Sequence, residues 1–169
     1  MASAAKTSGY APVNGIRLAF QTIGEGRPLI LLHGGFGSVE MFGPNVEALA
    51  AGRQVIGVDL QSHGRTPAAD RPMRFERMAD DVVALIGHLG FENADVMGFS
   101  LGVAGDTDGL PPAHAVEFFG LLDGGLRDAG WDGSGMTHHR LAILPGLTHY
   151  DINVAPALAQ AVIPFLDGK

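Results

Sequence analysis

Apolar and polar positions along the chain alternate in short blocks that predict strands and helices in turn. Two extended runs flank the pair Asn14-Gly15, and an Asn-Gly pair between such runs is a strong signal of a β-hairpin. Continuous apolar runs at residues 28–32, 54–60 and 95–99 are typical of strands covered on both faces. The pattern therefore predicts an antiparallel hairpin at the edge of a sheet of buried strands.

Helices are predicted between these strands. The first is expected over residues 38–51, with Ser38 as its capping residue and an interruption at Gly43-Pro44. The second begins at residue 74 or 75, has apolar residues at intervals of three and four, and stops at Gly90. This alternation predicts an α/β fold with a mostly parallel sheet and helices on both faces.

The regular alternation ends at Gly102. Residues 103–105 form a segment that is too short for a helix or a strand. A turn-rich loop and a glycine-rich stretch follow within about the next 35 residues. We still predict one domain over residues 1–169, with residues 1–9 flexible. The remaining predicted elements are a helix at 113–122, a strand at 140–144 and a closing helix at 156–166.

Composition narrows the classes of function. A chain with 46% hydrophobic and 17% charged residues can bury a core. Eighteen acidic against eleven basic residues give a net charge of −7, which disfavours nucleic acid and anionic membranes as partners. The chain has no cysteine, which excludes disulfides and thiolate zinc sites, and no apolar run long enough to span a membrane. We expect a cytoplasmic protein with no metal and no cofactor.

The pentapeptide Gly98-Phe99-Ser100-Leu101-Gly102 follows directly after a predicted strand. Glycines on both sides of a serine permit a sharp, strained turn from strand to helix, which exposes the hydroxyl as a nucleophile. An ordinary glycine-flanked turn is the alternative, and the position after a strand favours the nucleophile.

A second glycine-rich loop, residues 33–37, leaves the end of the strand at 28–32. Accessible backbone amides in such a loop can stabilise the oxyanion of acyl transfer, and we expect Gly35 and Leu101 to donate them, with Gly34 and Phe36 touching the substrate. A dinucleotide site is the alternative, but Glu40 occupies the place of its third glycine.

A serine nucleophile needs a base and an orienting acid. His149 follows the last predicted strand and can reach over the carboxyl edge of the sheet, where Ser100 also lies. Asp106 and Asp108 are both candidates for the acid, and the chain order Ser, Asp, His is the one expected. The other histidines are interpreted as surface or loop-bracing residues: His33, His63, His88, His114, His138 and His139.

Together these segments resemble the α/β-hydrolase fold family, in its serine hydrolase branch. The segment 59–66 is similar to the family's D-x-x-G-x-G pattern, and Gly105-Asp106-Thr107-Asp108 to its acid segment. The resemblance implies that Asp108, the second aspartate, orients the histidine. Serine at position 100 argues against relatives with an aspartate nucleophile, such as haloalkane dehalogenases and epoxide hydrolases.

The chain departs from the family after Ser100. Relatives continue into a helix, further strands and a cap before the acid, whereas only three residues separate Gly102 from Asp106. We therefore expect a truncated α/β hydrolase without a cap, with the junction near residues 102–105. Sheet surface left uncovered predicts a homodimer or marginal stability.

The expected activity is cleavage of small carboxylic esters through an acyl-enzyme. Ser100 attacks, His149 transfers protons, and Asp108 holds the imidazole. The alternative is an impaired or inactive variant of the fold that serves as a binding or structural module. A fluorophosphonate probe, which labels an active serine, distinguishes the two.

Overall fold

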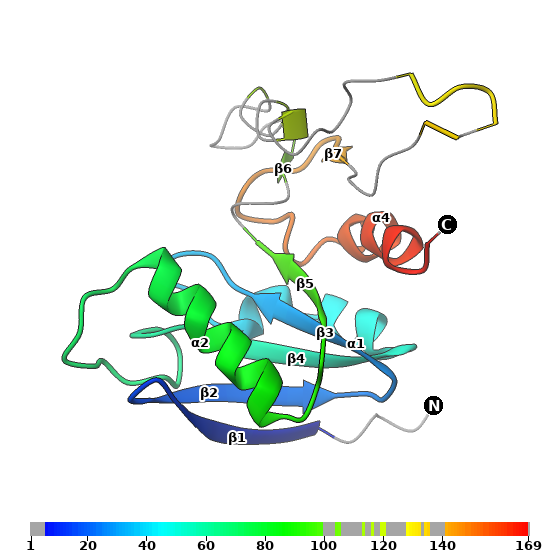
Figure 1. Cartoon of the computed structure of the whole chain (residues 1–169). Helices are drawn as coiled ribbons and strands as arrows, with labels where there is room; N and C mark the ends of the chain where they lie inside the picture. The colour runs from blue at the N-terminus through cyan, green and yellow to red at the C-terminus, as the bar shows by residue number, and fades with distance from the viewer. Residues whose placement is uncertain are drawn as a thin grey trace. The chain divides into compact units, whose positions relative to one another are not determined.

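The computed structural model describes residues 6–99, 104–105, 113, 116, 119–120, 128–132, 134–135 and 141–168 (Figure 1). The chain divides into two compact units, Met1–Leu101 and Gly102–Lys169. The division falls at the junction that the sequence predicts. The single domain over residues 1–169 stays a prediction.

The first unit is built on a five-stranded sheet in the order β1-β2-β4-β3-β5. β2 is antiparallel to β1 and β4, while β3 is parallel to β4 and β5, so four of the five strands run in one direction. This mixed, mostly parallel sheet confirms the predicted α/β class. The strands are β1 (Lys6–Val13), β2 (Ile16–Ile23), β3 (Arg27–Leu32), β4 (Arg53–Asp59) and β5 (Asp95–Gly98).

The predicted hairpin is β1-β2. Asn14 and Gly15 form its two-residue turn with φ values of 45° and 82°, the left-handed pair that such a turn requires. The pairing continues to Lys6 opposite Ile23. The expectation that residues 1–9 are flexible is therefore wrong for residues 6–9, which the long antiparallel register holds in β1.

The predicted first helix is divided in two. A 3-10 helix, η1 (Val39–Phe42), is followed by α1 (Asn45–Ala50), and the break lies at Gly43-Pro44, where Gly43 has a φ of 47°. Ser38 stands at the N-cap position, but its side chain makes no capping hydrogen bond, contrary to expectation. The sequence located the break correctly because proline cannot continue a helix.

The second helix, α2 (Phe75–His88), agrees with its prediction. Gly90 follows the C-cap residue with a φ of 81°, as expected for a glycine that terminates a helix. Val82 and Leu85 of α2 pack with Ile30 and Ile56 of the sheet. Figure 1 shows α2 on one face of the sheet and α1 on the other.

On the α1 face, the backbone of η1 comes very close to the sheet. A Cβ at Gly57 in β4 would overlap the side chain of Val39. This glycine therefore permits the close packing of η1, and with it the position of the loop that precedes η1.

The second unit contains a short parallel pair of strands, β6 (Ala104–Gly105) and β7 (Ile143–Leu144), and helix α4 (Pro156–Leu166). The expectation that residues 103–105 are too short for an element is wrong, because Ala104 and Gly105 find hydrogen-bonding partners in β7. The closing helix is confirmed. The described residues of the helix predicted at 113–122 are all helical: Ala113, Val116, Phe119 and Gly120.

Candidate active site

Three neighbouring parallel strands of the first unit end at one edge of the sheet. β3 lies between β4 and β5, so the loops that follow them leave from the same edge. The backbone N–H of Phe99 still donates to the carbonyl of Leu32 at 2.9 Å, which extends the pairing by one residue. Residue 100 therefore follows a residue that is fixed beside the end of β3.

His33, directly after β3, joins two of these loops. Its Nε2 accepts the backbone N–H of Leu60 at 3.0 Å, and its Nδ1 donates to the carbonyl of Gly34 at 2.6 Å. Because Nε2 is an acceptor, the imidazole is neutral with its proton on Nδ1. Burial lowers the pKa of His33 from its ordinary 6.5, which favours the same neutral form.

The glycine-rich loop makes a tight turn in which the N–H of Gly37 donates to the carbonyl of Gly34 at 3.3 Å. Phe36 occupies the position of this turn that needs a left-handed backbone, with a φ of 58°, and its side chain is fully exposed. The amide of Gly35 has no hydrogen-bond acceptor among the described residues. It can therefore donate to a ligand oxygen, and the role of Gly35 as an oxyanion donor stays a prediction.

The buried carboxylate of Asp59, at the end of β4, holds the next part of both loops. Its Oδ1 accepts the N–H of Val39 at 2.9 Å, and its Oδ2 accepts the N–H and Nε–H of Arg65 at 3.0 and 2.7 Å. Burial alone would raise the pKa of Asp59, but these hydrogen bonds outweigh it and keep the pKa below 3.8. Gly64, with a φ of 51°, is required here because a Cβ would lie 2.6 Å from Cγ of Asp59.

An open pocket of about 290 Å³ lies between the two loops. Ser62, which takes the place of the first glycine in the D-x-x-G-x-G pattern, has a φ of 64°. Like Phe36, Ser62 is therefore a non-glycine residue with a left-handed backbone conformation. The pocket is lined by Phe36, Gly37, Ser62, His63, Gly64 and Met73.

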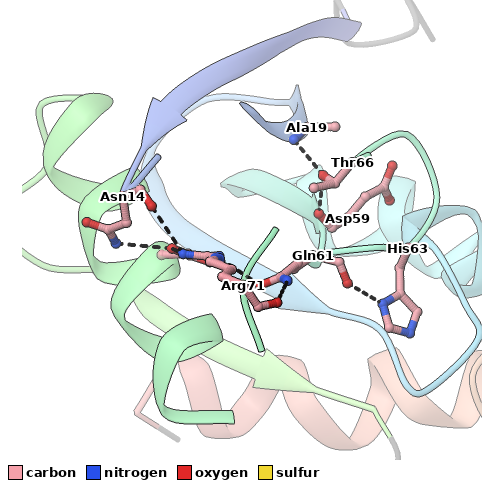
Figure 2. Close-up of polar contacts among 8 residues, drawn as sticks. Asn14, Ala19, Asp59, Gln61, His63, Thr66 and Arg71 are labelled. Atoms are coloured by element: carbon pink, nitrogen blue, oxygen red, sulfur yellow. Dashed lines mark hydrogen bonds and ion pairs between the residues drawn. The ribbon is translucent and has the colours of Figure 1, made fainter. Parts of the chain in front are cut away.

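Nδ1 of the His63 ring lies 2.8 Å from the backbone carbonyl oxygen of Gln61, which can only accept, so Nδ1 carries a proton. When the ring is neutral, Nε2 therefore has an unshared electron pair. Figure 2 shows Nε2 pointing away from Gln61, and no described residue hydrogen-bonds to it. The rings of His33 and His63 lie with centroids 5.0 Å apart.

Gln61 is itself fixed by Arg71 from the far end of the same loop. Its amide donates to the carbonyl of Arg71 at 3.2 Å and accepts from Arg71 Nε at 2.9 Å (Figure 2). Arg71 also donates to the carbonyl of Asn14 at 3.2 Å and forms an ion pair with buried Asp81 of α2. The loop that carries His63 is thereby tied to the hairpin and to α2.

The predicted base, His149, lies in the loop after β7 of the second unit. The N–H of Thr148 donates to Asp151 at 2.6 Å, and the ring of His149 meets that of Tyr150 edge-on at 5.9 Å. Because β6 and β7 are parallel, the segments after Gly105 and after Leu144 leave from one edge of this pair.

The other predicted residues divide between described and undescribed parts of the chain. Gly34, Gly35 and Phe36 lie together in the loop after β3. Ser100, Leu101 and Asp108 lie outside the described residues, so the triad and its oxyanion hole stay predictions. The described part holds no group of three or more His, Cys, Asp or Glu side chains arranged to bind a metal ion.

Sequence reasoning missed the pocket residues Ser62, His63 and Met73. The replacement of a motif glycine by Ser62 was a visible signal, because a residue that takes that glycine's left-handed backbone conformation is strained. Met73 had no signal, since it stands in a loop whose path the sequence does not define. No helix in the described ranges combines the length and the apolar character needed to cross a membrane.

Comparison with known proteins agrees with this geometry. A family model described as the alpha/beta hydrolase fold matches residues 27–103, and the match ends at the predicted junction. Over residues 27–103 the chain is similar to the α/β hydrolase fold family, and the first unit has that fold.

Two curated α/β hydrolases illustrate the similarity. The AB hydrolase superfamily protein YisY of Bacillus subtilis (strain 168) is 42% identical over 93 residues, which cover 53% of this chain and 34% of that protein. The sn-1-specific diacylglycerol lipase ABHD11 of Danio rerio is 32% identical over 116 residues, covering 67% and 36%. The chain spans about a third of the length of these relatives.

Among solved structures, the epoxide hydrolase CorEH is similar with a TM-score of 0.53 and 36% sequence identity. The match covers 56% of this chain and 34% of that α/β hydrolase. This coverage corresponds in extent to slightly less than the first unit of the chain.

Proposed function

We propose that the chain is a serine hydrolase that cleaves small carboxylic esters through an acyl-enzyme intermediate. The observation that carries this proposal is the parallel pairing of β5 with β3. Ser100 stands two residues beyond β5 in the sequence, and Gly35 lies in the loop after β3. Because the two strands are parallel, the segments that follow them leave from the same edge of the sheet. A nucleophile and an oxyanion donor are needed at such an edge.

The second unit contains the residues predicted as the acid and the base. Asp108 stands three residues after β6 in the sequence, and His149 stands five residues after β7. Segments this short leave both residues within reach of the edge shared by the two parallel strands. An acid and a base that start from one edge can form the pair that activates a serine.

In the proposed reaction, the Ser100 hydroxyl attacks the ester carbonyl while His149 takes its proton. The amides of Gly35 and Leu101 stabilise the negative oxygen, and Asp108 orients and stabilises the imidazolium. The imidazolium then protonates the leaving alcohol. His149 next deprotonates a water molecule, which attacks the acyl-enzyme. The bond to Ser100 then breaks, the imidazolium returns the proton to the Ser100 oxygen, and the carboxylic acid is released. The reaction requires the two units to bring His149 to Ser100.

Serine at position 100 favours ester cleavage over the chemistry named for CorEH. The family resemblance associates epoxide opening with an aspartate nucleophile, and this chain has a hydroxyl instead. Only three residues stand between Gly102 and Asp106, so few walls enclose the substrate, which favours short or varied esters. The cytoplasmic location and the homodimer stay predictions.

A labelling experiment tests the function. We expect the full chain to react with a fluorophosphonate probe and to hydrolyse p-nitrophenyl butyrate, and Ser100→Ala to lose both. Ser8→Ala, in exposed strand β1, is the matched control and should keep both. A folded chain that stays unlabelled would instead support the inactive binding module, and unchanged hydrolysis by Ser100→Ala would exclude this nucleophile.

A further inference from the structure

We propose that the pocket between Phe36 and His63 recognises an apolar group that carries a hydroxyl, and that this hydroxyl donates a hydrogen bond to Nε2 of His63. The proposal deepens the proposed function, since it assigns a substrate class to the same edge of the sheet. That the bound group is part of an ester substrate rests on the proposed function. The binding itself needs only the first unit.

Backbone strain points to a ligand site here. Asn14, Phe36 and Ser62 are the described non-glycine residues with positive φ, and Asn14 is explained by its hairpin turn. Phe36 and Ser62 both line the pocket, although each belongs to a different loop. Non-glycine residues in this region destabilise the fold and concentrate at ligand sites, where the side chain has a use.

The apolar part of the ligand is indicated by Phe36 and Met73. Both are large apolar side chains that stand exposed beside the pocket, Phe36 fully and Met73 by 58%. A ligand between these two side chains would bury apolar surface that otherwise faces water.

The polar part is indicated by the tautomer of His63. Its Nδ1–H is already committed to Gln61, so Nε2 offers only an acceptor to a ligand while the ring is neutral. The acceptor is the backbone carbonyl of Gln61, and Arg71 holds the side-chain amide of the same residue through both its oxygen and its nitrogen, which fixes this part of the loop. An acceptor at a fixed position selects a ligand with a hydroxyl donor over one that can only accept.

Benzyl alcohol and benzyl methyl ether form a matched pair of probes, because only the alcohol can donate. With the 15N-labelled full chain, we expect the ring spectrum of His63 to show the Nδ1–H tautomer and to shift at Nε2 on addition of the alcohol. We expect the alcohol to bind about two- to tenfold more tightly than the ether, the range for one net hydrogen bond.

Variants separate the two parts of the site. His63→Phe should bind both probes equally, His63→Gln, which keeps an acceptor, should retain part of the preference, and Phe36→Gly should weaken both probes alike. His88→Ala, at an exposed position of α2, is the control and should change nothing.

Equal binding of the two probes to the unchanged chain, or an Nε2–H tautomer of His63, would overturn the proposal without any variant. Because the readout is binding, it can also be made on Ser100→Ala. Selective binding without probe labelling would refute the hydrolase function alone, and labelling without selective binding would refute the pocket alone.

Discussion

At the scale of single residues, His33 shows how one buried side chain fixes two loops. Both ring nitrogens are used, one as an acceptor from Leu60 and one as a donor to Gly34. A proton added to Nε2 would remove the acceptor and place a charge in a site that is 4% exposed. The arrangement of the two loops therefore depends on the neutral imidazole.

This dependence predicts the pH profile of stability. The pKa of His33 lies below 6.5 in the folded chain and near 6.5 in the unfolded chain, so the unfolded state binds more protons in between. The free energy of unfolding should therefore fall as the pH decreases through 6.5 towards the folded pKa. Asp59, whose pKa lies below 3.8, contributes its own loss only at lower pH.

Urea unfolding between pH 8 and pH 5 measures this effect. We expect the fall in stability to be smaller for His33→Gln, which cannot gain a proton, and unchanged for His88→Ala. An NMR titration of the histidine rings gives an independent measure, in which His33 should titrate below 6.5. A titration midpoint of His33 above 6.5 would contradict a neutral ring that is hydrogen-bonded at both nitrogens.

The same scale shows where sequence reasoning ends. A glycine-rich turn such as Gly34-Gly35-Phe36-Gly37 suggests that a glycine adopts the left-handed conformation, yet Phe36 does so. Gly37 has no positive φ, and a Cβ there would overlap only the flexible Sδ end of Met41 in η1. The glycines of such a turn therefore do not by themselves show which residue takes the left-handed conformation.

At the scale of elements, patterns that are local in the chain predicted the structure well. The hairpin depends on one dipeptide, and α2 on an apolar stripe with a terminating glycine. Strand β6 of the pair β6-β7 was missed because these two-residue strands are defined only by pairing with each other, between residues that are 39 positions apart in the chain. Pairing over such a separation leaves almost no periodic signal in either segment.

The loop between β4 and α2 shows how elements hold a site. It contains residues from Leu60 to Arg74; Asp59 holds Arg65 in its first half, and the contacts of Arg71 hold its far end. The side chain of Asp81, 1% exposed, accepts from Arg71 and from Asn14 at 3.1 Å. One buried ion pair thus connects the hairpin, α2 and the loop that carries His63.

Arg71→Met should destabilise the fold by about 3–5 kcal/mol, because the carboxylate of Asp81 would stay buried without its cation. The double variant Arg71→Met with Asp81→Leu should recover part of this loss, since no unpaired charge remains. Chemical denaturation measures both. If the single and the double variant lost the same free energy of unfolding, the charges of the ion pair would contribute nothing beyond the packing of the two side chains.

At the scale of the whole molecule, the predicted chemistry is divided between two units. The first carries the strand before Ser100 and the free amide of Gly35, and the second carries His149. Fold prediction succeeded where the family pattern is continuous, up to residue 103. The triad could not be derived in the same way, because it depends on how the two units meet across a junction that its relatives do not have.

The choice between Asp106 and Asp108 tests this division. β6 ends at Gly105 beside Leu144 of β7, so Asp106 is the first residue beyond the shared edge and Asp108 the third. His149 is the fifth residue beyond it, and the family resemblance implies that Asp108, the second aspartate, is its partner.

Asp108→Asn should lower kcat for p-nitrophenyl butyrate by about three to four orders of magnitude, because the amide cannot hold the imidazole in the required tautomer or stabilise its charge. Asp106→Asn should change kcat by less than about tenfold, since outside the triad it alters only a nearby charge. The reverse order of effects would assign Asp106 as the acid. Equal, small effects would mean that neither carboxylate reaches His149, and the chemistry would then have to proceed without an orienting acid.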